Sequence, residues 1–139
     1  MVNVILDAKL NNWETVYDFL KKNLSHSGMM KIDVERFCVA CEEIFTNICL
    51  YAYRGNEEGK VEVRLEIEQD TVKVHLIDEG IAFDPTQKTS RIEIEAGKNI
   101  DNRKIGGLGI HIAKKIVDFM EYERVEGRNM LFISKKLDK

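Results

Sequence analysis

CEEIFTNICLYAY, residues 41–53, is a largely apolar stretch with helical periodicity that carries an acid and an amide four positions apart. At about 100° per residue, the apolar side chains of this region share an arc of about 140°. Glu43 and Asn47 project about 40° apart, just beyond one edge of that arc, whereas Glu42 projects about 100° from Glu43. We therefore expect Glu43 and Asn47 to border the buried face of a helix, with Glu42 in solvent.

Two interpretations of this pair remain open on spacing alone. A carboxylate beside a pocket can take a proton from water or from a hydroxyl group, and an amide oxygen can hold Mg²⁺. The alternative is that Glu43 and Asn47 are ordinary polar residues at the boundary of a packed face.

The composition indicates a single compact domain over residues 1–139, because 44% of the residues are hydrophobic. The net charge is −3, with acids and bases mixed along the chain, so we expect no nucleic-acid-binding surface. No apolar run reaches the roughly 18 residues of a membrane span, and no basic segment followed by an apolar core marks a signal peptide. A cytoplasmic protein without a membrane segment is therefore expected.

The cysteines, Cys38, Cys41 and Cys49, all fall in one candidate helix. Cys38 and Cys41 have the C-x-x-C spacing of redox and zinc sites, but no second Cys or His pair completes a tetrahedral site. We expect small buried core residues instead.

Periodicity predicts alternating strand and helix segments along the chain. They are a strand over 2–10, a helix over 12–24 capped at Asn11-Asn12, a helix capped by Asp33 and ending near Tyr53, a hairpin over 60–68 and 71–77, a helix from Gly106–Gly109 to about Met120, and strands over 121–126 and 129–136 joined at Gly127-Arg128. The charged run 123–128 is predicted to be a solvated hairpin tip. This order predicts an α+β fold, a two-layer sandwich in which helices cover one face of a mostly antiparallel, mixed sheet.

A long aperiodic stretch, residues 78–105, follows the first hairpin, and loops of this length are usually functional. Asp78 ends the strand, and Gly80 lets the backbone bend away. A strand-end carboxylate can accept a hydrogen bond from an exocyclic amine such as adenine N6, and the small Ala82 would let a flat ring approach. A plain turn is the alternative.

Gly106-Gly107-Leu108-Gly109 lies at the predicted start of the next helix. Glycines there are entropically costly, but they expose backbone N–H groups at the positive end of the helix, which suits phosphate. A glycine-rich hinge for a mobile loop is the other interpretation, and the two are compatible.

Taken together and in this order, the three motifs resemble the GHKL ATPase fold of gyrase-type ATPases and histidine kinases. The match is closest to the small single-domain anti-sigma factor/serine-protein kinase family. The family's acid-x₃-Asn with a following Ala-Tyr is similar to Glu43 through Tyr53, its Asp-x-Gly-x-Gly/Ala-Phe-Asp-Pro to Asp78 through Pro85, and its Gly-Leu-Gly-Ile/Leu to Gly107 through Ile110. The resemblance covers essentially the whole chain.

The resemblance implies roles for these positions in binding ATP and Mg²⁺. Asn47 would ligate Mg²⁺, Glu43 would be the base that deprotonates an acceptor serine, Asp78 would hold the adenine amine beside Gly80 and Ala82, and Gly106, Gly107, Leu108 and Gly109 would contact the phosphates. Candidates for the γ-phosphate contact are Arg91, Lys98, Arg103 and Lys104. The chain departs from the family at Tyr51, where many members have His, and at Ala82, which replaces a glycine.

The implied function is phosphorylation of a serine on a STAS-type anti-sigma-factor antagonist, which regulates transcription by partner switching with a sigma factor. The alternative is a nucleotide-dependent protein-binding switch without kinase activity. The family also implies a homodimer, for which the strand at 2–10 is a candidate surface.

Overall fold

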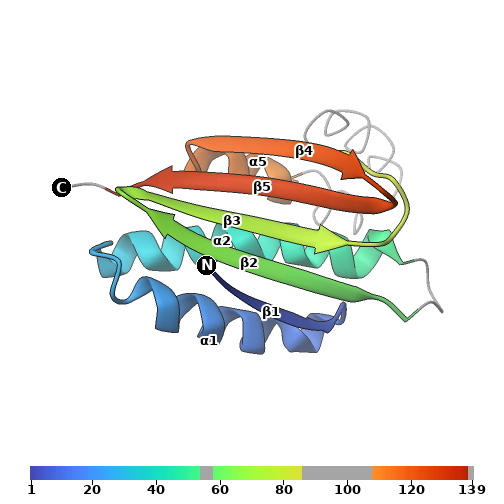
Figure 1. Cartoon of the computed structure of the whole chain (residues 1–139), viewed down its shortest axis with the longest axis horizontal. Helices are drawn as coiled ribbons and strands as arrows, with labels where there is room; N and C mark the ends of the chain where they lie inside the picture. Colours follow the sequence, from blue (N-terminus) through green and yellow to red (C-terminus); the bar gives the residue numbers. More distant parts are fainter. Residues whose placement is uncertain (54–57, 86–107, 138–139) are drawn as a thin grey trace.

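The computed structural model describes residues 1–53, 58–85 and 108–137, and these form one sheet with helices on one of its faces (Figure 1). The strand order is β1-β2-β3-β5-β4, and every pairing among these strands is antiparallel. The strands are β1 Val2–Asp7, β2 Lys60–Glu68, β3 Thr71–Asp78, β4 Phe119–Val125 and β5 Arg128–Lys136, and the α-helices are α1 Trp13–Leu24, α2 Lys31–Asn47 and α5 Leu108–Ile116. The predicted α+β two-layer sandwich is confirmed.

The core lies between the sheet and the helices, where period-two strands meet helical stripes. Alternate residues of β2 and β3 point toward the helices and are at most 2% exposed: Val61, Val63, Leu65, Val72, Val74 and Leu76. Phe37 and Phe45 of α2 fill the facing layer and are completely buried. Burial of each such large side chain contributes about 1.5–3 kcal/mol, so this layer fixes α2 against the middle of the sheet.

One of the two predicted helix caps is wrong. Asn12 is the N-cap residue of α1, as predicted, although its side chain donates to the carbonyl oxygen of Asp7 at 2.9 Å instead of accepting from its own helix. α2 begins at Lys31 with Met30 at the N-cap, which places Asp33 inside the first turn. An acid there still interacts favourably with the positive end of the helix.

The last helix and hairpin also differ from the sequence prediction. α5 ends at Ile116, and Met120 belongs to β4, where it packs against the core from a strand. The hairpin turns at Glu126-Gly127, with φ of 50° and 79°, one residue earlier than predicted. Positive φ at both central residues matches the turn type that best suits the twist of a two-residue hairpin.

α2 continues into one π-helical turn, Ile48–Ala52, which carries the chain to the end of β3. The carbonyl oxygen of Ala52 accepts a hydrogen bond from the Ile81 N–H at 3.0 Å. A Cβ atom on Gly80 would lie only 2.2 Å from that same oxygen, so a side chain at this position has no room. This close approach brings the end of α2 beside the turn after Asp78.

The three cysteines are free thiols on α2 and its π-helical extension. Cys38 and Cys41 are buried in the core, as predicted, whereas Cys49 is only partly buried. Burial raises the pKa of the Cys38 and Cys49 thiols to about 12, so neither is a thiolate near neutral pH. Among the described helices, none is long and apolar enough to cross a membrane.

Candidate functional site

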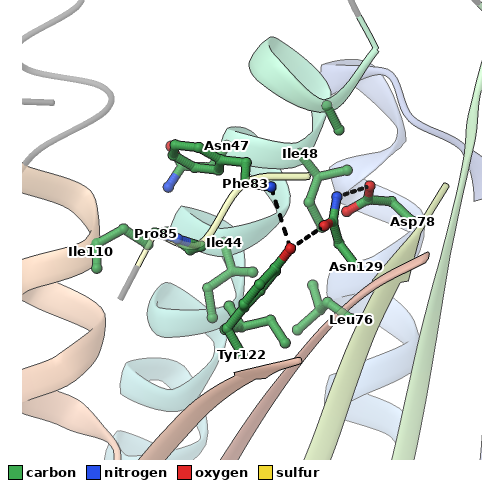
Figure 2. A pocket seen from close by; sticks show the side chains of 12 residues that line it. Ile44, Asn47, Ile48, Leu76, Asp78, Phe83, Pro85, Ile110, Tyr122 and Asn129 are labelled. Carbon is green, nitrogen blue, oxygen red and sulfur yellow. Dashed lines mark hydrogen bonds between the residues drawn. The ribbon is translucent and has the colours of Figure 1, made fainter. Parts of the chain in front are cut away.

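A pocket lies where the end of α2, its π-helical turn, the end of β3 and the start of β5 meet (Figure 2). Asn47 and Asp78, which are 31 positions apart in the sequence, both line it. Apolar side chains make up most of the remaining wall, among them Ile44, Ile48, Leu76, Phe83 and Ile110. A largely apolar cavity with a few convergent polar groups is typical of a small-molecule site.

Asn47 is the most unusual residue of this pocket. Its side chain is 6% exposed, and neither Oδ1 nor Nδ2 has a hydrogen-bond partner among the described residues. Leaving a buried polar group unpaired costs about 1–3 kcal/mol, which is why native proteins rarely do so. The residue therefore fits a bound group that its amide oxygen would contact, such as Mg²⁺.

Glu43 lies one helical turn before Asn47 and is partly buried, whereas Glu42 is exposed, so the predicted helix geometry is confirmed. Burial raises the pKa of the Glu43 carboxyl, and the negative charge of Glu42 raises it further. A carboxylate with a raised pKa is a stronger base, which suits proton abstraction. Glu43 does not itself line the pocket described above; it lies beside it on α2.

Asp78 is 4% exposed at the end of β3. Its Oδ1 accepts hydrogen bonds from the Gly80 N–H at 2.8 Å and from Nδ2 of Asn129 at 2.9 Å. Burial raises the pKa of Asp78, although these bonds and the positive charge of Arg124 pull it partly back. The carboxyl group is thus a buried, anchored acceptor at the pocket wall.

Sequence reasoning missed Asn129, which bonds Asp78, and Tyr122 and Arg124, which bond Asn129. Asn129 pairs with Asp78 in the β3–β5 register, and the Tyr122 hydroxyl donates to Oδ1 of Asn129. Arg124 donates to the carbonyl oxygen of Gly80 at 2.8 Å, so it is not the purely solvated residue that the charged run 123–128 predicted. Only knowledge that β5 lies beside β3 would have revealed this cluster.

Some of the other predicted site residues belong to the described part of the chain, and the rest do not. Gly80 lies against Ala52, while Ala82 is exposed and does not line the pocket; Phe83, next in the chain, does. Leu108 and Gly109 are the first residues of α5, which packs beside α2. The remaining predicted contacts lie outside the described residues: Gly106, Gly107, Arg91, Lys98, Arg103 and Lys104.

The pocket holds open space between these side chains. The centres of water-sized molecules can occupy about 30 Å³ of it. Phe83 forms part of the wall, and its ring centroid lies 6.4 Å from that of Tyr51.

Comparison with known proteins identifies the class. Residues 6–135 match the family described as "Histidine kinase-like ATPase domain". The chain therefore belongs to this ATPase family. The fold agrees: the histidine kinase domain of the blue-light activated histidine kinase from Erythrobacter litoralis EL346 superimposes with a TM-score of 0.58. That match covers 92% of this chain and 60% of that chain at 13% sequence identity, so it speaks for the fold alone.

Within the family, the chain is similar to proteins named serine-protein kinase RsbW. The protein from Listeria innocua serovar 6a is 30% identical over 104 residues, which cover 74% of this chain and 66% of that protein. The protein from Staphylococcus aureus strain MSSA476 is 31% identical over 96 residues, which cover 68% of this chain and 60% of that protein. The chain thus matches less than two thirds of the length of either relative.

Proposed function

We propose that this chain binds Mg·ATP and acts as a protein serine kinase on a STAS-type anti-sigma-factor antagonist. In this role it regulates transcription by partner switching with a sigma factor. The observation that carries the proposal is the buried amide of Asn47, which has no hydrogen-bond partner within residues 1–53, 58–85 and 108–137. It lines the same pocket as Asp78 and lies one helical turn from Glu43. Membership of an ATPase family and similarity to proteins named serine-protein kinases support it.

Each of the three residues has a distinct task in this proposal. The side-chain oxygen of Asn47 ligates Mg²⁺, and Asp78 accepts a hydrogen bond from the adenine amine. Glu43 takes the proton of the acceptor serine hydroxyl as the serine oxygen bonds to the γ-phosphorus and the bond to the ADP oxygen breaks. ATP supplies the phosphoryl group and Mg²⁺ neutralises phosphate charge, so that positioning is the main contribution of the protein.

Incubation with [γ-³²P]ATP, Mg²⁺ and a purified STAS-domain partner tests the transfer step. The partner should become labelled on serine. Glu43→Ala should lower the rate by at least about 100-fold, the lower end of what a positioned base contributes, while nucleotide binding is kept. Glu42→Ala is the matched control, because it removes the neighbouring but exposed carboxylate, and it should retain transfer.

Failure of labelling has a defined meaning. If wild-type protein binds Mg·ATP but labels no STAS partner, the kinase proposal is wrong and a nucleotide-dependent binding switch replaces it. If Glu43→Ala still transfers at the wild-type rate, the assignment of the base is wrong. The proposed homodimer, for which the outer edge of β1 is the candidate surface, is tested separately by light scattering.

A further inference from the structure

Asn129 ties Asp78 to the turn that follows it. The two residues pair directly across β3 and β5, and both are at most 6% exposed. Nδ2 of Asn129 donates to Oδ1 of Asp78 at 2.9 Å and to the carbonyl oxygen of Ile81 at 2.7 Å. One amide nitrogen thus holds both the strand-end acid and the backbone beyond it.

The orientation of this amide is fixed by its other side. Oδ1 of Asn129 accepts from the Tyr122 hydroxyl and from Nη1 of Arg124, the latter at 3.1 Å. Reversing the amide would turn its nitrogen toward the Arg124 guanidinium, which has only donors, and its oxygen toward the acceptor oxygens of Asp78 and Ile81. Every polar atom of the Asn129 side chain is therefore engaged in the one arrangement that its surroundings allow.

As a consequence, the two carboxylate oxygens of Asp78 differ in their hydrogen bonding. Oδ1 receives two donors, the Gly80 N–H and Nδ2 of Asn129. Within the described part of the chain, no residue donates to Oδ2, and Figure 2 shows the dashed contact on one oxygen only. A carboxylate with one oxygen engaged by two donors cannot rotate freely, so the position of the other oxygen is set as well.

We propose that Asn129, held by Tyr122 and Arg124, is a positioning residue that commits Oδ1 of Asp78 and leaves Oδ2 to recognise the exocyclic amine of a purine base. This inference rests on the proposed function, because it takes the pocket to bind ATP. It assigns preference for a 6-amino purine to the network behind Asp78 as well as to Asp78 itself. Asn129 also lines the pocket, and its proposed effect on base recognition is exerted through the Asp78 carboxylate.

The discriminating measurement is the ratio of affinities for ATP and for purine riboside triphosphate, which lacks the 6-amino group. Both are titrated with Mg²⁺ by calorimetry into wild-type protein and into folded variants. Wild-type protein should prefer ATP by at least about tenfold, the value of one hydrogen bond to a charged group. Asn129→Ala should reduce the ratio to less than about threefold, and Asn129→Ser, which restores one donor, should recover part of it.

Tyr122→Phe gives a second, milder test that keeps the aromatic ring and the strand. It removes the donor to Oδ1 of Asn129, so the ratio should fall to a value between those of wild type and Asn129→Ala. Tyr17→Phe is the matched control, because the Tyr17 hydroxyl also bonds a polar side chain, Glu35, but does so outside the pocket. Its ratio should equal that of wild type.

The outcomes separate the two proposals. If wild-type protein binds neither nucleotide, the proposed function fails and this inference fails with it. If wild type prefers ATP and the variants lose affinity for both nucleotides equally, the network is merely structural and the positioning role is wrong. If Asn129→Ala does not fold, an unchanged ratio in Tyr122→Phe overturns the inference, and a reduced ratio supports it.

Discussion

Replacing Asn47 by leucine should stabilise the free protein while removing nucleotide binding. The amide is 6% exposed and unpaired among the described residues, so folding removes it from water without compensation. Leucine has the same branching pattern and no polar atoms. The adjoining cavity, of about 30 Å³, can accommodate the extra volume of the leucine side chain. Replacing a buried asparagine that has hydrogen-bond partners by leucine would instead destabilise the protein.

The size of the effect follows from the cost of an unpaired buried polar group, about 1–3 kcal/mol. An unfolding entropy of about 2.1 cal/mol/K per residue over 139 residues gives about 0.29 kcal/mol/K. The melting temperature of Asn47→Leu should therefore rise by about 3–10 °C above wild type. Added Mg·ATP should then raise the melting temperature of wild type but not that of the variant.

Differential scanning calorimetry of both proteins, with and without Mg·ATP, measures these shifts. Asn23→Leu is the matched control, since Asn23 is a helical asparagine whose Nδ2 does have a partner, the Phe19 carbonyl oxygen at 2.8 Å. Its melting temperature should not rise, and Mg·ATP should still stabilise it. A lower melting temperature for Asn47→Leu than for wild type would refute the reasoning, because it would show that the amide stabilises the free fold.

Three further outcomes are expected. Gly80→Ala should lower the melting temperature by about 3–10 °C. The new Cβ would meet the Ala52 carbonyl oxygen at 2.2 Å, and overpacking costs about 1–3 kcal/mol. An unchanged melting curve would contradict the close packing of Gly80 against Ala52. Phosphotransfer should be lost as pH falls through the raised pKa of Glu43. Glu42→Gln should move the midpoint of this pH–rate profile to lower pH, because burial still raises the pKa of Glu43 but the neighbouring negative charge is gone. A midpoint that does not move would contradict the effect of the Glu42 charge on Glu43. Cys41, fully buried with a raised pKa, should resist a thiol reagent at pH 8 until the protein is unfolded, and rapid labelling of the native protein would be inconsistent with its position in the core.

Local periodicity was sufficient to predict much of the fold and the relation of Glu43 to Asn47. A helix repeats every 3.6 residues and a strand every two, so which residues share a face depends on spacing alone. The extents of β2 and the α2 segment were predicted closely for this reason, as was the exposure of Glu42. Boundaries were less secure, because the cap at Met30 is made without a side-chain hydrogen bond that sequence would reveal.

The rest of the site depends on contacts between distant segments. Asn129 lies opposite Asp78 only because β5 inserts between β3 and β4, and no local pattern specifies this order. The π-helical turn at Ile48–Ala52 likewise looks like a continued α-helix in sequence, yet it decides how closely the chain approaches Gly80. These contacts between distant segments fix Asp78, at the end of a strand, in the wall of the pocket.

Binding of Mg·ATP, measured by calorimetry, tests the central claim most directly. Wild-type protein should bind one nucleotide per chain, and this binding should weaken strongly when EDTA removes Mg²⁺. Asp78→Asn should weaken nucleotide binding by about 10- to 150-fold while the protein stays folded. The reason is that the variant keeps Oδ1 for Gly80 and Asn129 but presents a donor in place of Oδ2. The absence of any measurable binding to wild type, or an affinity unchanged in Asp78→Asn, would contradict the assignment of this pocket to ATP.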